Sequence, residues 1–427
     1  MLKVDIGGIR GGSENILQGQ SLDYFVAMRF VRSSNQSKFT ILLLSLVMSL
    51  SNCTLMFPVM APFSDLPEPT GPYSVATHSS TWTDSSRDET FTEENDFRRL
   101  VVQTWFPIEK QADLPTLPYI DNPELRLPAL AEQLRLPLSL ISHFGEVKTH
   151  STALPGDHKL EQKFPVILFS HGLSGMRFQN TALIEELVSY GYVVFAADHS
   201  YGANITIFDD GETAEYRAGK RRALNAAFLN TIDLSQIDIL VRDLSYIIDV
   251  IKASRSDSFL GGLPMDKNRI GVIGLSLGGA VALSSMAADS RVGVAMVLDG
   301  WYAPIPDSVI TMGINRPIFH LGQKQWSDPG NYERMDEMLS HSSGPTYKML
   351  VPGTLHTDFT DMPLFTRFSL FIGYTRVQNP IWLNDLIRVN TRGFFDVYLK
   401  DYPETEMKEL ILSQRDVSSY IFTPHLP

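Results

Sequence analysis

The segment from residue 270 to residue 280 constrains the fold more than any other part of the chain. An apolar stretch passes into residues 274–278, which read Gly-Leu-Ser-Leu-Gly, and then into small residues that favour a helix. A serine between a strand and a helix in this G-x-S-x-G pattern is typical of a sharp turn that exposes its hydroxyl. The pattern predicts Ser276 as a nucleophile, and a glycine-rich turn that only connects strand and helix is the alternative.

The sequence around this segment alternates between apolar runs and amphipathic stretches. Short continuous apolar runs are typical of strands buried on both faces of a sheet, and the helical spacing of apolar residues in 236–253 is typical of a helix packed on a core. This alternation predicts an α/β fold with a mostly parallel central sheet and helices on both faces. The apolar runs lie at residues 165–170, 192–197, 294–298, 317–321 and 347–351.

The composition is that of a globular protein with a large core, since 44% of the 427 residues are apolar and 20% are charged. We expect one catalytic domain over residues 96–427, with regular structure beginning at Arg99. Residues 61–95 are rich in Pro, Ser, Thr and Asp, which predicts a linker or extended arm. Residues 1–60 are expected to form an N-terminal extension.

An apolar run over residues 39–50 follows a basic stretch and predicts an export signal, so we expect a periplasmic or extracellular protein. Two alternatives would hold the protein at a membrane. Residues 39–60 reach about 20 residues, the length that spans a bilayer. Cys53 follows Leu-Ser-Asn, which resembles a bacterial lipoprotein box and predicts lipidation. A buried helix of the fold is the remaining interpretation.

The charged residues and the single cysteine exclude several classes of function. The net charge is -12 and no dense Lys/Arg run is present, which argues against a nucleic-acid partner. One cysteine allows no intramolecular disulfide and no thiolate metal cluster. Because no phosphate-binding loop, dinucleotide fingerprint or metal-ligand spacing occurs, we expect neither a cofactor nor a metal.

A serine hydroxyl needs a histidine as general base and an acid that orients the imidazole. The chain contains ten histidines. Folds built around this turn place the three residues in the order Ser, Asp, His. His356 follows the last predicted strand and satisfies this order, whereas His171 and His199 precede Ser276. His356 is therefore our candidate base, and a hydrogen-bonded loop histidine is the alternative.

Two aspartates are candidates for the acid. Asp299 ends the predicted strand that follows the serine turn, and Asp328 lies in the loop after the next strand. We prefer Asp299 because it stands directly at a strand end. The sequence around Asp328 is a good turn for structural reasons alone.

The oxyanion of an acyl-transfer intermediate requires two backbone N–H donors. The first is the residue after the nucleophile, Leu277, and the second is expected from a loop that follows a neighbouring strand. Residues 171–175 read His-Gly-Leu-Ser-Gly directly after such a strand, which makes Leu173 the candidate. A glycine loop that only turns the chain is the alternative.

Three further polar residues lie near this region. Asp198 and His199 end a predicted strand at the edge of the sheet where sites form, so we expect them near the pocket without requiring that they react. Asp243 lies on the predicted helix 236–253 and is expected to be a structural ion-pair or capping partner.

These motifs resemble the platelet-activating factor acetylhydrolase family, in its plasma-type phospholipase A2 branch and bacterial esterase relatives. The resemblance covers roughly residues 65–400, and Leu275 and Leu277 depart from it because family members often have His and Phe there. The pieces that carry it are Thr-Gly-Pro-Tyr-Ser-Val at 70–75, Val-Gln-Thr-Trp-Phe-Pro at 102–107, Phe-Ser-His-Gly-Leu at 169–173, Asp-His at 198–199, residues 269–279 and Leu-Asp-Gly-Trp at 298–301.

The resemblance implies an α/β-hydrolase fold and a serine esterase that acts on a small-molecule or lipid ester without a cofactor. It implies Ser276 as nucleophile, Asp299 rather than Asp328 as acid, His356 as base, and Leu173 and Leu277 as oxyanion donors. Other hydrolases use the same set of catalytic residues and remain as alternatives. They are a general carboxylesterase, a polyester or dienelactone-type hydrolase, and an amidase or peptidase. An inactive surface-binding homologue would have lost one of these catalytic residues.

Residues 359–385 are too apolar for a simple surface loop. We expect them to form an acyl-binding wall or a lip that contacts a membrane surface. A helical cap with its own small core is the alternative.

Overall fold

The computed structural model of the chain describes residue 58 and residues 61–153, 160–217, 236–326, 328–415 and 417–422. In these ranges the main sheet is 10-stranded, in the order β12-β11-β10-β9-β8-β4-β5-β2-β1-β3. Its strands are β1 Ser74–Asp88, β2 Phe97–Ile108, β3 Ser151–Ala153, β4 Phe164–Ser170, β5 Val193–Asp198, β8 Met265–Leu275, β9 Val292–Leu298, β10 Ile318–Gln323, β11 Thr346–Val351 and β12 Ser418–Phe422. A separate hairpin pairs β6 Ile205–Ile207 with β7 Thr213–Glu215.

The centre of the sheet is parallel, from β5 through β4, β8, β9 and β10 to β11. Antiparallel strands extend it on both sides, where β2 pairs with β5 and β12 pairs with β11. Every residue of β4, β5 and β11 is buried, which is why these strands read as continuous apolar runs. The predicted α/β architecture is therefore confirmed.

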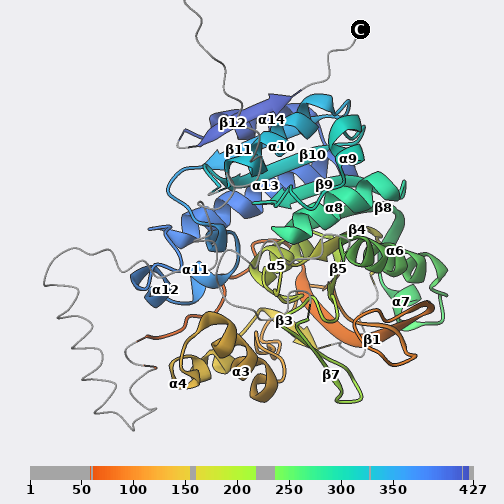
Figure 1. Cartoon of the computed structure of the whole chain (residues 1–427), viewed down its shortest axis with the longest axis vertical. Coiled ribbons are helices and arrows are strands. Elements are labelled where there is room, and N and C mark those ends of the chain that lie inside the picture. The colour runs from red at the N-terminus through yellow and green to blue at the C-terminus, as the bar shows by residue number, and fades with distance from the viewer. Residues whose placement is uncertain are drawn as a thin grey trace, which may run out of the picture.

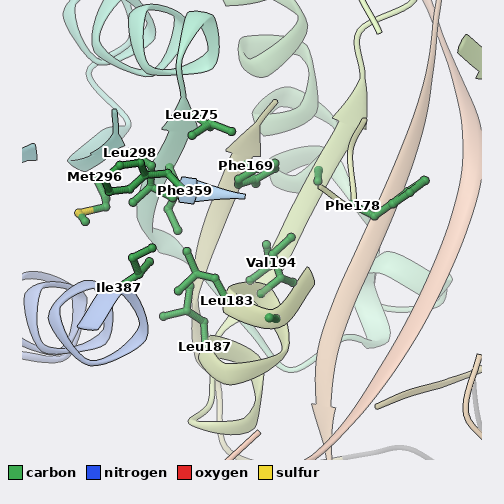
Figure 2. Packing of buried hydrophobic residues seen from close by; sticks show 14 of the residues in the cluster. Phe169, Phe178, Leu183, Leu187, Val194, Leu275, Met296, Leu298, Phe359 and Ile387 are labelled. Carbon is green, nitrogen blue, oxygen red and sulfur yellow. The ribbon is translucent and has the colours of Figure 1, made fainter. Parts of the chain in front are cut away.

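Helices cover both faces of the sheet and close two hydrophobic cores (Figure 1). On one face, α5 (Thr181–Ser189) and α13 (Pro380–Lys400) pack on the strands. Figure 2 shows this core, where Leu183 and Leu187 of α5 and Ile387 of α13 lie opposite side chains of the sheet such as Phe169 and Met296. On the other face lie α6 (Ile237–Ala253) and α8 (Leu277–Ala288).

The remaining helices are short or peripheral. Helices α11 and α12 lie beside α3 and α4 at one side of the molecule (Figure 1), and all four contribute side chains to a single apolar pocket. The helices are α3 Pro123–Leu134, α4 Leu138–Ile141, α7 Phe259–Gly262, α9 Asp307–Met312, α10 Pro329–His341, α11 Met362–Phe365, α12 Phe368–Phe371 and α14 Glu404–Ser413, with 3₁₀-helices η2 Ser142–Glu146 and η5 His356–Phe359.

The expectation that residues 61–95 form an arm before regular structure begins at Arg99 is wrong. Residues 74–88 form the long strand β1, drawn in orange in Figure 1, and β2 already starts at Phe97. β1 pairs antiparallel with β2 from Ser74 opposite Ile108 to Asp84 opposite Arg98. Much of β1 is exposed or half-buried, so its Ser and Thr residues resemble a loop in composition although they form a ladder with β2.

The expected export signal or anchor within residues 1–60 lies outside the described residues, apart from Pro58, and stays a prediction. Across the ranges that the structure describes, none of the helices is both long enough and apolar enough to cross a membrane.

Candidate active site

Ser276 stands in the turn between β8 and α8, as the G-x-S-x-G pattern predicts. Its backbone angles are φ 58° and ψ −119°, a strained combination for a residue with a side chain. Three backbone hydrogen bonds hold the turn: Ser276 N–H donates to Leu298 O at 3.0 Å, and Ser276 O accepts from Gly279 N and Trp301 N, each at 2.9 Å. Strain stored at a residue that is so firmly held is typical of a functional site.

The two glycines of the motif allow the backbone contacts that form the turn. A Cβ atom on Gly274 would lie 1.9 Å from the carbonyl oxygen of Gly278. A Cβ atom on Gly278 would lie 2.0 Å from the carbonyl oxygen of Ser170, at the end of the neighbouring strand β4. Both atoms are backbone and cannot turn away, so these positions require glycine.

Asp299 and His356 are in direct contact. Nδ1 of His356 lies 2.6 Å from Oδ2 of Asp299, and the aspartate is completely buried. Asp299 directly follows β9, and His356 begins η5 after β11. The strand ends thus bring together two residues that are 57 positions apart in the chain. Because a carboxylate accepts only, Nδ1 of His356 carries a proton and its Nε2 remains free to accept one.

The Asp299 carboxylate is held by Gln323, the last residue of β10, and by Trp326 in the loop that follows it. Gln323 donates its backbone N–H to Oδ1 and its side-chain Nε2 to Oδ2, each at 2.9 Å. The indole Nε1 of Trp326 donates to Oδ1 at 3.0 Å, and the same ring lies edge-on to His356 at 5.0 Å between centroids. Sequence reasoning missed both residues, because no spacing pattern links a loop to a carboxylate from another strand.

Asp328, the other acid candidate, has a different role. Its side chain caps α10 by accepting from the backbone N–H of Gly330 at 3.0 Å. This is the ordinary function of an aspartate before a helix. The structure thus brings Asp299, and not Asp328, to the imidazole.

The His356 loop is tied to the segment that follows it. Asp358 accepts backbone N–H groups from Leu355 at 2.7 Å and from Arg376 at 3.0 Å. The hydroxyl of Thr357 donates to the carbonyl oxygen of Tyr374. The side chains of Thr357 and Asp358, directly after His356, therefore hold its loop, and the His356 side chain is 32% exposed, open enough for a small group to reach.

Leu173 lies in a loop beside Ser276. A Cβ atom on Gly172 would be 3.3 Å from Cβ of Ser276, which places this loop against the elbow, the turn of residues 274–278 that carries Ser276. The loop is held by Gly175 N–H to Gly172 O at 2.9 Å and by Ser174 N–H to Gly202 O at 3.1 Å. Leu277 occupies the first turn of α8, where backbone N–H groups have no acceptor within the helix. Both predicted donors therefore flank the serine.

Asp198 and Asp243 lie in buried ion pairs, as expected for Asp243. Asp198 is buried in an ion-pair network with Arg177 and Arg126. Asp243 is buried against Arg98, whose Nη2 lies 2.7 Å from Oδ2. His199 is buried between Ser170 and Asp243 and does not reach the elbow serine through a hydrogen bond.

In the part of the chain that the structure describes, no three His, Cys, Asp or Glu side chains are grouped so that they could hold a metal ion. Nucleophilic acyl transfer requires a serine, an imidazole base with an orienting carboxylate, and N–H donors for the oxyanion. Ser276, His356, Asp299, Leu173 and Leu277 are the candidates for these roles.

Comparisons with known proteins place the chain in a family. The model of the family described as platelet-activating factor acetylhydrolase, isoform II, matches residues 60–375. The platelet-activating factor acetylhydrolase of Canis lupus familiaris is 26% identical over 343 residues, 73% of this chain and 71% of the relative. A probable 1-alkyl-2-acetylglycerophosphocholine esterase of Arthroderma benhamiae is 27% identical over 366 residues, 79% of this chain and 87% of the relative.

The match to the bovine acetylhydrolase is shorter: it is 26% identical over 235 residues, and the chain spans about half the length of that relative, 51%. Among solved structures, a ferulic acid esterase from Streptomyces cinnamoneus superposes with a TM-score of 0.67 at 24% identity. The superposition covers 83% of this chain and 99% of the esterase, and it shows the shared α/β-hydrolase fold.

The resemblance that the sequence motifs indicated is confirmed by a family match over most of the chain. The chain belongs to the platelet-activating factor acetylhydrolase, isoform II, family and is related to its lipid esterases.

Proposed function

We propose that the chain hydrolyses carboxylic esters of lipids through an acyl-enzyme on Ser276. The observation that carries this proposal is the 2.6 Å contact between His356 and the buried Asp299, beside a serine on a strained elbow. Such a contact leaves Nε2 as the basic nitrogen of the imidazole, which is the protonation state that general-base catalysis needs.

In the proposed reaction, Nε2 of His356 takes the proton of the Ser276 hydroxyl as the serine oxygen attacks the ester carbonyl carbon. The backbone N–H groups of Leu173 and Leu277 donate to the oxyanion that forms. The imidazolium then gives its proton to the leaving alcohol as the carbon–oxygen bond breaks. A water molecule, deprotonated by the same imidazole, releases the acid from Ser276. Asp299 orients the imidazole ring both while the acyl-enzyme forms and while water hydrolyses it.

The relatives support a lipid substrate with a short acyl group. Their names describe a platelet-activating factor acetylhydrolase and a probable 1-alkyl-2-acetylglycerophosphocholine esterase. We propose that this chain likewise releases a short acyl group from a glycerophospholipid.

We propose further that an apolar lip touches the lipid surface. Within residues 359–385, Phe359 and Phe365 join the main core and do not form a separate small core, whereas Phe371 and Trp382 are 64% and 38% exposed. Leu138 on α4 is also 43% exposed, and α4 meets α12 around the shared apolar pocket. Large apolar side chains that are exposed in this way are available for contact with a membrane or micelle.

Export of the protein is proposed from the sequence of residues 39–60 alone. The test is expression of the full chain in a secreting host, followed by immunodetection in cytoplasmic, membrane and external fractions. Protein that accumulates only inside the cell contradicts export. Comparison of the full chain with Cys53→Ser then separates lipidation from the other two forms of export, because only a lipidated protein leaves the membrane fraction after this substitution.

The function is tested by hydrolysis of p-nitrophenyl esters from acetate to palmitate and of a 1-alkyl-2-acetylglycerophosphocholine. Wild-type protein lacking residues 1–53 is compared with Ser276→Ala. We expect rapid turnover of short-chain esters and of the phospholipid, lost in the variant. Turnover that survives Ser276→Ala contradicts the assigned nucleophile. Turnover of soluble esters without any of the phospholipid would indicate a general carboxylesterase.

A further inference from the structure

A second serine, histidine and aspartate form a hydrogen-bonded chain beneath the loop that carries Leu173. The Ser170 hydroxyl lies 3.0 Å from Nε2 of His199, and Nδ1 of His199 lies 2.9 Å from Oδ2 of Asp243. All three residues are essentially inaccessible to solvent. No ester can reach this buried triad, so its hydrogen bonds act on the protein and not on a substrate.

The buried triad is anchored at its acid end. Asp243 on α6 accepts from Nε of Arg98 at 3.1 Å and from Nη2 of Arg87 at 3.0 Å, in addition to the Arg98 ion pair. Burial alone would raise the pKa of Asp243, but the Arg98 guanidinium and the His199 side chain hold that pKa below its ordinary value. The carboxylate is therefore charged, and it fixes the His199 ring with a proton on Nδ1.

His199 reaches the residue before Leu173 through His171. The backbone N–H of His199 donates to Nε2 of His171 at 3.1 Å, and Nδ1 of His171 lies 2.7 Å from the carbonyl oxygen of Gly172. Burial lowers the pKa of His171 to about 4, so the ring is neutral at neutral pH. A neutral ring that accepts at Nε2 must donate from Nδ1, which fixes the direction of both bonds.

His199 also reaches the residue after Leu173. Its carbonyl oxygen accepts from the backbone N–H groups of Gly202 and Ala203, each at 2.8 Å. The carbonyl oxygen of Gly202 in turn accepts from Ser174 N–H at 3.1 Å. The two neighbours of Leu173 in the chain are therefore both tied to the backbone of His199.

Ser170 connects the buried triad to the other oxyanion donor. It is the last residue of β4, directly before the loop, and its carbonyl oxygen lies against Gly278, where a Cβ atom would come within 2.0 Å. Gly278 follows Leu277 in the first turn of α8. The residue that the imidazole of His199 holds thus lies between the two segments that carry Leu173 and Leu277.

We propose that Ser170, His199 and Asp243 are positioning residues that aim the backbone N–H of Leu173 at the oxyanion. The inference rests on the proposed function, since it concerns Leu173, one of the two oxyanion donors assigned in that function. These residues touch no substrate, and they act by holding the backbone on each side of the donor. Because an oxyanion exists only after attack on the carbonyl, a displaced donor lowers kcat more than it raises KM.

The test compares Ser170→Ala with wild type on p-nitrophenyl acetate and on its thiono analogue, in which sulfur replaces the carbonyl oxygen. Loss of a whole oxyanion donor costs about 10²-fold to 10³-fold in kcat, so we expect a displaced donor to cost about 10-fold, with KM nearly unchanged. Sulfur accepts hydrogen bonds weakly. The kcat for the thiono ester should therefore fall less than the kcat for p-nitrophenyl acetate. The oxo-to-thiono ratio, which is the kcat for p-nitrophenyl acetate divided by the kcat for its thiono analogue, should be lower in the variant than in wild type.

Ser285→Ala is the matched control. Ser285 is a buried serine on α8 whose hydroxyl has no hydrogen-bond partner among the described residues, so its removal should change neither kcat nor the ratio. Ser170→Cys provides a second variant of similar size with a weaker donor, and we expect its kcat between those of wild type and Ser170→Ala. If Ser170→Ala does not fold, Ser170→Cys takes its place in the comparison with wild type.

The outcomes separate this inference from the function on which it rests. If wild type is active, Ser276→Ala is inactive and the Ser170 variants keep both kcat and the oxo-to-thiono ratio, the buried triad is only structural and the inference is overturned alone. A lower melting temperature with unchanged kcat leads to the same conclusion. If wild type hydrolyses no ester, or Ser276→Ala remains active, the proposed function fails and this inference fails with it.

Discussion

His356 touches Asp299 through Nδ1, and the other oxygen of that carboxylate, Oδ1, accepts from Gln323 N–H and Trp326 Nε1. The two oxygens of one buried side chain thus face different partners. Oδ2 receives the imidazole and the side-chain N–H of Gln323, whereas Oδ1 is held by two N–H donors, with the Tyr332 hydroxyl at 3.4 Å.

This division predicts the effect of Asp299→Asn. With Oδ1 facing two fixed N–H donors, the amide oxygen takes that position and the amide nitrogen faces His356. The imidazole then carries its proton on Nε2 and cannot accept one from Ser276. We expect kcat for p-nitrophenyl acetate to fall roughly 10³-fold to 10⁴-fold. Asp328→Asn, at the exposed cap of α10, should keep wild-type kcat, and equal losses in both variants would contradict the assignment.

Trp326→Phe tests the indole that sequence reasoning missed. Phenylalanine keeps an aromatic ring beside His356 but removes the N–H that donates to Asp299. A hydrogen bond to a charged group contributes about 1.5–3 kcal/mol, so we expect kcat to fall about 10-fold or more with little change in KM. The matched control is Trp82→Phe, which removes an indole bond to Ser80 on β1. A change in KM alone would place Trp326 in substrate binding instead.

Gly278→Ala should destabilise the protein although alanine normally favours a helix. In an exposed helix the change from Gly to Ala stabilises by about 1 kcal/mol. Here the new Cβ would meet the Ser170 carbonyl oxygen at 2.0 Å, and neither backbone can move without disturbing the sheet. We expect the free energy of unfolding, measured with urea, to fall by about 3 kcal/mol or more. Gly262→Ala has open space around the new Cβ and should not destabilise the protein.

Glu185 predicts how stability depends on pH. Burial raises its pKa to about 7, and it accepts from Ser151 and from the backbone N–H of His150. As pH rises from about 4.5 to about 7, the unfolded chain releases this proton while the folded protein keeps it. The carboxyl group therefore lowers stability with rising pH, by at most about 1.4 kcal/mol per pH unit, and the loss stops above pH 7.

In Glu185→Gln this side chain does not titrate in either the folded or the unfolded state. The free energy of unfolding of the variant, relative to wild type, should therefore increase from pH 4.5 to pH 7 and then level off. Denaturant unfolding at half-unit pH intervals measures this difference. Parallel curves for the two proteins would show that the carboxyl group titrates normally.

The apolar lip predicts a difference between aggregated and soluble substrates. Phe371→Ser with Trp382→Ser removes two exposed apolar side chains. We expect the ratio of activity on micellar esters to activity on p-nitrophenyl acetate to fall by up to about 10³-fold, because about 2 kcal/mol of apolar burial is lost for each of the two large side chains and about 1.4 kcal/mol corresponds to a factor of ten. Leu412→Ser, on α14, removes an apolar side chain that is as exposed as Phe371 and should leave the ratio unchanged. A ratio that stays constant in the double variant contradicts lipid contact.

The sequence alone predicted the parts of the site that depend on local geometry and strand order. The elbow at Ser276 is visible because only glycine fits at positions 274 and 278, and the carboxyl ends of parallel strands bring Asp299 and the loop of His356 to one edge. The donors around Asp299 were not predictable, since Gln323 and Trp326 meet it only through tertiary packing. The strand β1 was missed because its exposed face has the composition of a loop.

The helices around the apolar pocket have a consequence for how this enzyme can change. The serine, its acid and its base stand on strand ends and on loops bound to the sheet, whereas α3, α4, α11 and α12 lie at one side of the molecule (Figure 1). Insertions, deletions or exchanges in α3 and α4 can therefore reshape the apolar pocket while the strand ends that carry Ser276 and Asp299 keep their places. Changes in α11 and α12 would also reach the base, because in the chain these helices lie between His356 and the residues that hold its loop.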